Sequence, residues 1–144
     1  MEDETKEESQ QPQTFEDLGV SDALRASVEA LGWEQPTPIQ VKSIPTGLAG
    51  SDLVGIAQTG TGKTGAFMLP SLERIETGKG LQVLVLCPTR ELAQQVCDDS
   101  EALAKGTRVR AASIYGGVAY DPQLKALKEG FEVITATPGR FLYP

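Results

Sequence analysis

The chain has 144 residues, of which 40% are apolar and 23% charged, a composition typical of one globular domain and not of a disordered chain. Its formal net charge of −7 argues against a protein that binds nucleic acid through a broad basic surface. Two cysteines and no histidine provide neither a disulfide framework nor a ligand set for structural zinc. Because no stretch is apolar enough for a signal peptide or a membrane span, we expect a cytoplasmic protein that does not enter membranes.

The first residues form an acidic segment. Residues 1–13 contain five acidic side chains and one lysine, a net charge of −4, and hardly any large apolar side chain. Such a segment cannot bury enough apolar surface to offset the entropy lost on ordering. We therefore predict a disordered acidic tail over 1–13, and the rest of the chain carries the remaining charge of −3.

Two helices are predicted after the tail. Ser21 is a suitable cap residue, apolar side chains at 24, 28 and 31 share one helical face, and Gly32 ends the pattern. Thr37 followed by Pro38 starts the second helix, because proline is favoured at the first helical position. This helix is predicted to run to about Leu48, with a bend at Pro45.

Beyond residue 50, short apolar runs alternate with segments of helical spacing. The runs are 53–56, 83–87, 109–115 and 133–135, and the helical segments are 67–75, 92–103 and 124–127. Strands that alternate with helices at this spacing predict βαβ units and a parallel sheet with flanking helices. Only about four strands are present, so the α/β fold is predicted to be incomplete.

The segment AQTGTGKTG at 57–65 has the spacing of a phosphate-binding loop. Its glycines let the backbone wrap around a phosphate, and the helix that follows adds positive potential from its free N–H groups. Lys63 would neutralise charge on the terminal phosphate, including charge that develops during transfer, and the Thr64 hydroxyl would ligate Mg²⁺. The simpler alternative is a flexible glycine turn, and Ala57 departs from the general pattern, which has glycine at that position.

Five segments in this order and at these spacings resemble motifs of the first RecA-like domain of DEAD-box RNA helicases. The segments are GWEQPTPIQ at 32–40 with Phe15 upstream, AQTGTGKT at 57–64, PTRELAQQ at 88–95, GG at 116–117 and TPGR at 137–140. The resemblance implies a P-loop RecA-like sheet, ATP and Mg²⁺ as cofactors, and RNA as partner. It also divides the chain into a Q motif region over 14–42 and a partial ATP-binding domain over 43–144.

The resemblance implies that the Q motif recognises adenine. Gln40 would hydrogen-bond the adenine edge through its amide, which offers both a donor and an acceptor, and Trp33 would pack on the base with Phe15 nearby. Alternatively, Gln40 forms a T-x-x-Q capping box with Thr37, and both aromatic residues belong to the core. The residues predicted to bind ATP are Phe15, Trp33, Gln40, Ala57, Gln58, Thr59, Gly60, Thr61, Gly62, Lys63 and Thr64.

The resemblance also implies contacts with the RNA backbone, without base recognition. The predicted RNA-binding residues are Pro88, Thr89, Arg90, Gly116, Gly117, Thr137, Pro138, Gly139 and Arg140. They follow predicted strands and begin helices, where ligands dock on open α/β sheets. Ordinary turn chemistry explains the threonines, prolines and glycines, but it does not explain the two arginines.

No predicted strand ends in the Asp-Glu-Ala-Asp motif that holds Mg²⁺ and orients water in this family. The resemblance therefore implies the N-terminal part of an ATP-dependent RNA helicase that is not catalytically competent alone. The alternative is a truncated, non-catalytic product that binds nucleotide or RNA. A different P-loop ATPase is disfavoured by the Q motif and by TPGR.

Overall fold

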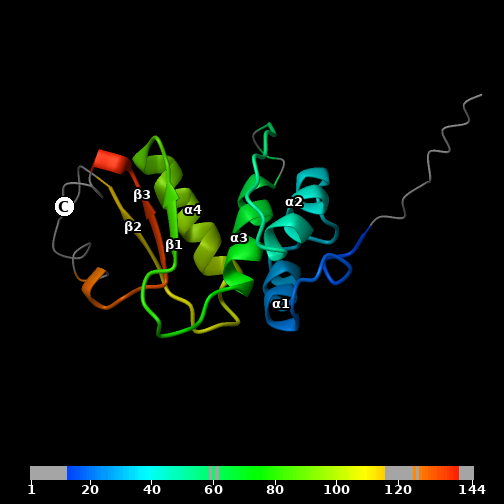
Figure 1. Cartoon of the computed structure of the whole chain (residues 1–144), viewed down its shortest axis with the longest axis horizontal. Coiled ribbons are helices and arrows are strands. Elements are labelled where there is room, and N and C mark those ends of the chain that lie inside the picture. Colours follow the sequence, from blue (N-terminus) through cyan, green and yellow to red (C-terminus); the bar gives the residue numbers. More distant parts are fainter. Residues whose placement is uncertain (1–12, 59, 61, 116–124, 126, 140–144) are drawn as a thin grey trace, which may run out of the picture.

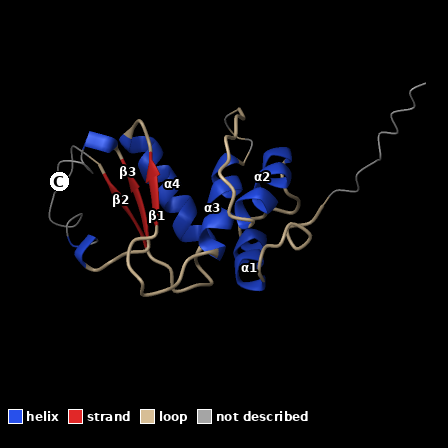
Figure 2. Ribbon diagram, viewed as in Figure 1, coloured by secondary structure: helices blue, strands red, loops and turns tan. Residues whose placement is uncertain are grey.

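The computed structural model describes residues 13–58, 60, 62–115, 125 and 127–139 (Figures 1 and 2). The elements, in chain order, are α1 (Asp22–Ala30), α2 (Pro38–Leu48), α3 (Lys63–Glu73), β1 (Val83–Leu86), α4 (Arg90–Leu103), β2 (Ala111–Ile114) and β3 (Val133–Ala136). The predicted tail falls outside the described residues except for its last position. None of the helices in the described ranges combines the length and the apolar character that crossing a membrane requires.

A parallel sheet forms one side of the molecule, with strand order β1-β3-β2. Val133 of the central strand pairs with Val83 of β1 and with Ala111 of β2. The chain therefore passes from β1 through α4 to the far edge of the sheet and returns to the middle. All four residues of β3 are buried, as expected for a strand that is covered on both faces.

The prediction of a strand at 53–56 is wrong. This segment pairs with no strand in the described part of the chain, which thus contributes three strands to the sheet and not four. Its side chains face solvent, with Val54 88% and Ile56 91% exposed. A short apolar run becomes a parallel strand only where a neighbouring strand supplies hydrogen bonds, and 53–56 lies instead beside α2.

Helix α4 covers one face of the sheet and joins it to the other helices. Val85 and Val133 from the sheet share a core with Ala93 and Val96 of α4. On the opposite face, Ile134 belongs to a smaller core with Leu127 and Phe131. Because this smaller core covers less of the sheet, Leu84 and Leu86 of β1 remain 41% and 55% exposed.

The remaining helices pack on one another beside the sheet. α1 begins after Ser21 as predicted, although the Ser21 side chain makes no capping bond and its backbone N–H donates to Glu73 Oε1 at 2.6 Å. α2 begins at Pro38 after Thr37, as predicted, and contains Pro45. At the closest approach of α2 and α3, a Cβ on Gly47 would lie 2.8 Å from Cβ of Pro70, so the two helices meet only because residue 47 is glycine.

The amino-terminal edge of the sheet is held by a buried carboxylate. Glu132 is 1% exposed, and its carboxylate accepts hydrogen bonds from the backbone N–H groups of Arg110 at 3.2 Å and Gly78 at 3.4 Å. The Arg110 guanidinium lies 3.8 Å from the same carboxylate and 4.5 Å from the centroid of the Phe131 ring. This network fixes the edge that lies away from the predicted site.

Candidate nucleotide and nucleic-acid site

The predicted phosphate-binding loop runs into α3, which begins at Lys63, within the predicted segment 57–65. Gly60 and Gly62 have φ of 81° and 84°, a left-handed conformation in which a side chain is strained. A Cβ on Gly62 would also lie 2.6 Å from Gln40 Nε2, so both backbone and packing require glycine there. Lys63 is exposed and Thr64 half-buried in the first turn of α3, where unpaired backbone N–H groups attract anions. Thr59 and Thr61 lie outside the described residues.

A cavity of about 620 Å³ joins this loop to the Q motif region. Its walls come from three parts of the chain: the Q motif region, the loop with the start of α3, and one face of α4. The lining residues are Gly32, Trp33, Glu34, Gln35, Thr37, Gln40, Gly60, Gly62, Lys63, Thr64, Gly65, Leu92, Gln95 and Asp99. This volume is in the usual range of ligand pockets.

The side-chain amide of Gln40 is engaged at both ends. Its Oε1 accepts a hydrogen bond from the Thr37 N–H at 3.0 Å, and its Nε2 donates to the Gly62 carbonyl at 3.2 Å. Gln40 is 2% exposed, although it lines the cavity. The capping arrangement with Thr37 is therefore present, and the same side chain connects α2 directly to the phosphate-binding loop. Each amide atom retains capacity for one further hydrogen bond.

Thr37 Oγ1 is a buried oxygen without a hydrogen-bond partner among the described residues. It lies in the wall of the cavity, and a Cβ on Gly62 would be 2.9 Å from it. Of the two contacts of the capping box, only the one from Thr37 N–H to Gln40 Oε1 is a well-formed hydrogen bond. A buried hydroxyl without a partner costs free energy, so this position favours a ligand that supplies one.

The two aromatic residues of the Q motif region differ in their position. Trp33 is half-buried and lines the cavity, and a Cβ on Gly65 would lie 2.8 Å from its Cζ3 atom. Phe15 is 5% exposed and lines a neighbouring cavity of about 510 Å³ that also contacts Trp33. Phe15 thus belongs to the core cluster against which Trp33 packs.

Ala57 and Gln58 do not line the cavity that contains the other described ATP-binding candidates of the loop. They line a separate cavity of about 550 Å³, formed between 53–58 and the first turns of α2. The structure therefore does not bring these two side chains into the cavity that contains Trp33, Gln40 and Lys63.

Leu92, Gln95 and Asp99 of α4 line the cavity and were not predicted from the sequence. Their spacing of three and then four residues places them on one helical face, a signal that becomes informative only when the partner of that face is known. Burial, with a smaller contribution from the neighbouring Asp98, raises the pKa of Asp99 above its ordinary value. Asp99 therefore adds a carboxyl group to the wall opposite the Q motif region.

The segments that follow the strands meet at one edge of the sheet. The Cys87 N–H donates to the Ala136 carbonyl at 2.8 Å, and the Thr137 N–H donates to the Ile114 carbonyl at 3.0 Å. These bonds place residues 88, 115 and 137 side by side at the carboxyl ends of the strands.

At this edge, Pro88, Thr89 and Arg90 are exposed at the start of α4. Thr89 Oγ1 accepts a hydrogen bond from the Leu92 N–H at 3.2 Å, so this threonine caps α4. Arg90 Nε donates to Glu91 Oε1 at 3.0 Å. The pKa of Glu91 is lowered, first by its own backbone N–H at the helix start and then by Arg90.

The segment after β3 is the other described part of the predicted RNA site. Thr137 is half-buried, whereas Pro138 and Gly139 are exposed and begin a helical turn. A Cβ on Gly139 would meet no atom within 4 Å, so the space in front of this turn is open. Gly116, Gly117 and Arg140 lie outside the described residues.

A model of the family described as DEAD/DEAH box helicase matches residues 37–143, which is more than half of the chain. The chain belongs to this family. It is 50% identical over 130 residues to the DEAD-box ATP-dependent RNA helicase CshA of Bacillus cereus. The match covers 90% of this chain and 25% of that relative, so the chain spans about a quarter of the relative's length.

Two solved structures of DEAD-box family proteins have the same fold. A DEAD box protein from the hyperthermophile Methanococcus jannaschii superposes with a TM-score of 0.85 at 41% identity, covering 90% of this chain and 36% of that one. The RNA-helicase Prp28 from Chaetomium thermophilum, bound to ADP, gives 0.81 at 40% identity, covering 91% of this chain and 34% of that one. The RecA-like fold class predicted from the sequence is thus confirmed.

The DEAD-box family uses ATP, generally with Mg²⁺. The left-handed glycines, the start of α3 and Lys63 suit a phosphate chain, while Trp33 and the unpartnered Thr37 hydroxyl suit the rest of the nucleotide. Thr64 would supply a hydroxyl ligand to Mg²⁺. Among the described residues, no group of three histidine, cysteine or acidic side chains could hold a metal. The bound metal would supply charge neutralisation at the phosphates.

Proposed function

We propose that this chain binds ATP in the cavity between the Q motif region and the phosphate-binding loop. We further propose that it binds the RNA backbone at the carboxyl edge of the sheet, as the N-terminal part of an ATP-dependent RNA helicase. The observation that carries the proposal is the single cavity of about 620 Å³ shared by Trp33, Gln40 and Lys63. A phosphate loop alone would suit many nucleotides, and the aromatic and amide groups in the same cavity favour a purine base.

Geometry supports the ATP part of the proposal. Lys63 and Thr64 begin an 11-residue helix, so the phosphates would meet free N–H groups, an ammonium group and a hydroxyl together. Trp33 offers an apolar surface for stacking a base. The remaining amide capacity of Gln40 allows one donor and one acceptor contact, which is the pattern that the adenine edge presents.

The RNA part of the proposal is supported by the exposed start of α4 and by the open turn at Gly139. The start of α4 offers backbone N–H groups and the turn offers the N–H of Gly139, and such contacts read the sugar-phosphate backbone and not the bases. Arg90 is exposed and is held near Glu91, so an RNA phosphate would compete with that carboxylate for the guanidinium. This arrangement suits an acidic chain, because it needs few positive charges.

We further propose that the 144-residue chain alone does not hydrolyse ATP in response to RNA. The printed sequence contains no Asp-Glu-Ala-Asp motif, and phosphoryl transfer needs groups that hold Mg²⁺ and orient water. The second candidate is therefore a non-catalytic product that binds nucleotide or RNA. The two candidates differ in whether RNA-stimulated phosphate release is ever seen with a protein that contains this chain.

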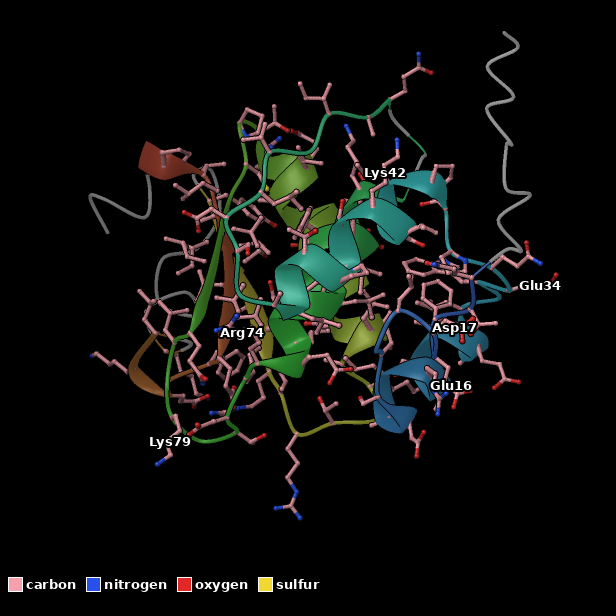
Figure 3. All side chains as sticks on the ribbon, turned by 45° about the vertical axis from the view of Figure 1, so that its right-hand side comes forward. Glu16, Asp17, Glu34, Lys42, Arg74 and Lys79 are labelled. Atoms are coloured by element: carbon pink, nitrogen blue, oxygen red, sulfur yellow. The ribbon has the colours of Figure 1, made fainter. Side chains whose placement is uncertain are left out.

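Binding of a fluorescent ATP analogue tests the proposal directly. Lys63→Ala should lower the affinity at least about tenfold, because a charge-assisted contact to phosphate is lost. The matched control is Lys79→Ala, since Lys79 is exposed, points away from the molecule (Figure 3) and does not line the cavity. Phosphate release with and without RNA is measured on the same preparations.

Equal affinities of wild type, Lys63→Ala and Lys79→Ala would contradict the ATP site. Clear RNA-stimulated phosphate release by the wild-type chain, abolished by Lys63→Ala, would support the ATP site but contradict the proposed inactivity of the chain alone.

A further inference from the structure

Gln94 lies within the PTRELAQQ segment in α4, was not among the predicted site residues, and is at the centre of a polar network. Its Oε1 accepts hydrogen bonds from Ser113 Oγ and from Tyr115 Oη, both at 3.0 Å. Its Nε2 donates to Asp98 Oδ1 at 2.8 Å. Gln94, Ser113 and Tyr115 are each half-buried, so these contacts are partly shielded from water.

The orientation of the Gln94 amide follows from its partners. An ionised carboxylate only accepts hydrogen bonds, so the atom facing Asp98 must be the NH₂ group. The amide oxygen then faces the two hydroxyls, and both of its lone pairs are used. Tyr115 and Ser113 are consequently held by one and the same atom of α4.

This network links the segments that are proposed to bind RNA. Gln94 lies one helical turn after Arg90, at the start of α4. Tyr115 follows β2 directly and precedes the GG segment at 116–117. A further hydrogen bond, from Thr135 Oγ1 to the Ala93 carbonyl at 2.8 Å, ties the same turn of α4 to β3.

We propose that Gln94 is a positioning residue for RNA binding, which holds Tyr115, at the end of β2, at a fixed distance from Thr89 and Arg90. An RNA strand then meets the start of α4 and the end of β2 without an entropic cost of ordering them. The inference rests on the proposed function, because it requires that these segments contact RNA. It adds a residue that touches neither RNA nor nucleotide.

A cavity of about 410 Å³ beside the network is consistent with this role. It is lined by Arg90, Glu91, Gln94, Gln95, Asp98 and Tyr115. The start of α4 and the end of β2 thus form the walls of one surface hollow, and a shift of Tyr115 would change its shape.

Two variants that each remove one hydrogen bond to the same oxygen test the proposal. Tyr115→Phe removes the bond at the end of β2, whereas Ser113→Ala removes an equivalent bond from within the strand, where the sheet already fixes the backbone. The measurements are the affinities for a labelled single-stranded oligouridine and for a fluorescent ATP analogue, and the Tm. Tyr115→Phe should weaken RNA binding about threefold to tenfold and leave ATP binding unchanged, because one hydrogen bond is lost.

Gln94→Leu, which removes the shared acceptor, should weaken RNA binding at least as much as Tyr115→Phe. Ser113→Ala should bind RNA like wild type. Equal losses in Tyr115→Phe and Ser113→Ala, or a loss that follows the Tm and extends to ATP, would show a purely structural network and overturn the inference alone. If the wild-type chain binds no RNA, the RNA part of the proposed function fails and the inference fails with it.

Discussion

At the scale of single residues, the site depends on how closely Gln40, Trp33 and the glycines of the loop approach one another. Gln40 donates to the Gly62 carbonyl, and both Gly62 and Gly65 lack the room for a Cβ. A Cβ on Gly65 would lie 2.7 Å from Gln40 Nε2 and 2.8 Å from Trp33 Cζ3. The glycine at 65 therefore allows the two side chains of the Q motif region to pack onto α3.

Gly65→Ala should destabilise the chain by about 1 to 3 kcal/mol, because the added methyl group overpacks a buried position. It should also weaken binding of the ATP analogue more than binding of pyrophosphate, since Trp33 and Gln40 would move while Lys63 would not. Urea unfolding and ligand titration measure the two effects. Gly55→Ala is the control, because a Cβ there would make only an ordinary contact of 3.5 Å with Ile39 and φ is not positive. Equal stability of the two variants would contradict this account.

Much of the site at residue scale could be predicted from the sequence, because the loop and T-x-x-Q have fixed local spacings. The dual role of Gln40 could not, since its contact with Gly62 spans 22 positions and depends on how α2 and α3 pack. Asp99 and Gln95 could not be assigned for the same reason: the face of α4 that lines the cavity is chosen by tertiary packing. Phe15 was placed in the ATP site by resemblance, and the structure places it in the core, lining a neighbouring cavity together with Trp33.

At the scale of elements, helix α4 connects the sheet to both proposed binding regions. Thr89 caps its first turn, Gln94 and Ala93 bond it to β2 and β3, and Leu92, Gln95 and Asp99 line the cavity of about 620 Å³. One helix thus borders both proposed binding regions. A substitution at the start of α4 is expected to change both stability and RNA binding. Variants that separate the two effects are therefore needed.

Thr89→Ala should lower the stability of the chain by about 1 kcal/mol, because the hydrogen bond to the Leu92 N–H is lost. For a domain of this size that corresponds to a fall in Tm of about 2 to 8 °C. Thr89→Ser keeps the hydroxyl and should unfold within about 2 °C of wild type. A thermal unfolding curve followed by circular dichroism checks both, and a Thr89→Ser variant as unstable as Thr89→Ala would show that the cap is not the cause.

The elements illustrate where prediction from sequence works. The helices α1 and α2, whose starts are marked in the sequence by Ser21 and by Thr37-Pro38, were predicted almost to their ends. The segment 53–56 has the composition of a strand, and yet no strand of the described chain pairs with it. Composition reports that a segment could be buried, whereas pairing depends on partners that lie elsewhere in the chain.

At the scale of the whole molecule, charge limits how RNA could be bound. The chain carries a net charge of −7, and the proposed RNA segments contain only the arginines at 90 and 140 as cations. Backbone N–H groups and helix starts contribute contacts that release few counterions. Binding should therefore depend on short-range geometry more than on long-range attraction.

The affinity for labelled single-stranded RNA should consequently fall only gently with salt. Two neutralised phosphates predict a slope of about −1.4 in a plot of log K against log salt concentration. Arg90→Ala should reduce the size of this slope by about 0.7. Titrations between low and moderate salt measure it, and a slope several times steeper would indicate a cationic surface that these segments do not provide.

The buried amide of Gln40 also has a thermodynamic consequence. Because one side chain bonds both to the start of α2 and to the Gly62 carbonyl, the order of that helix and the shape of the loop are coupled equilibria. A ligand bound at the loop should therefore slow hydrogen exchange of α2 amides that it does not contact. Conversely, a change that destabilises α2 should lower the affinity of the loop for that ligand. Helix and loop therefore respond to ligand as one cooperative unit.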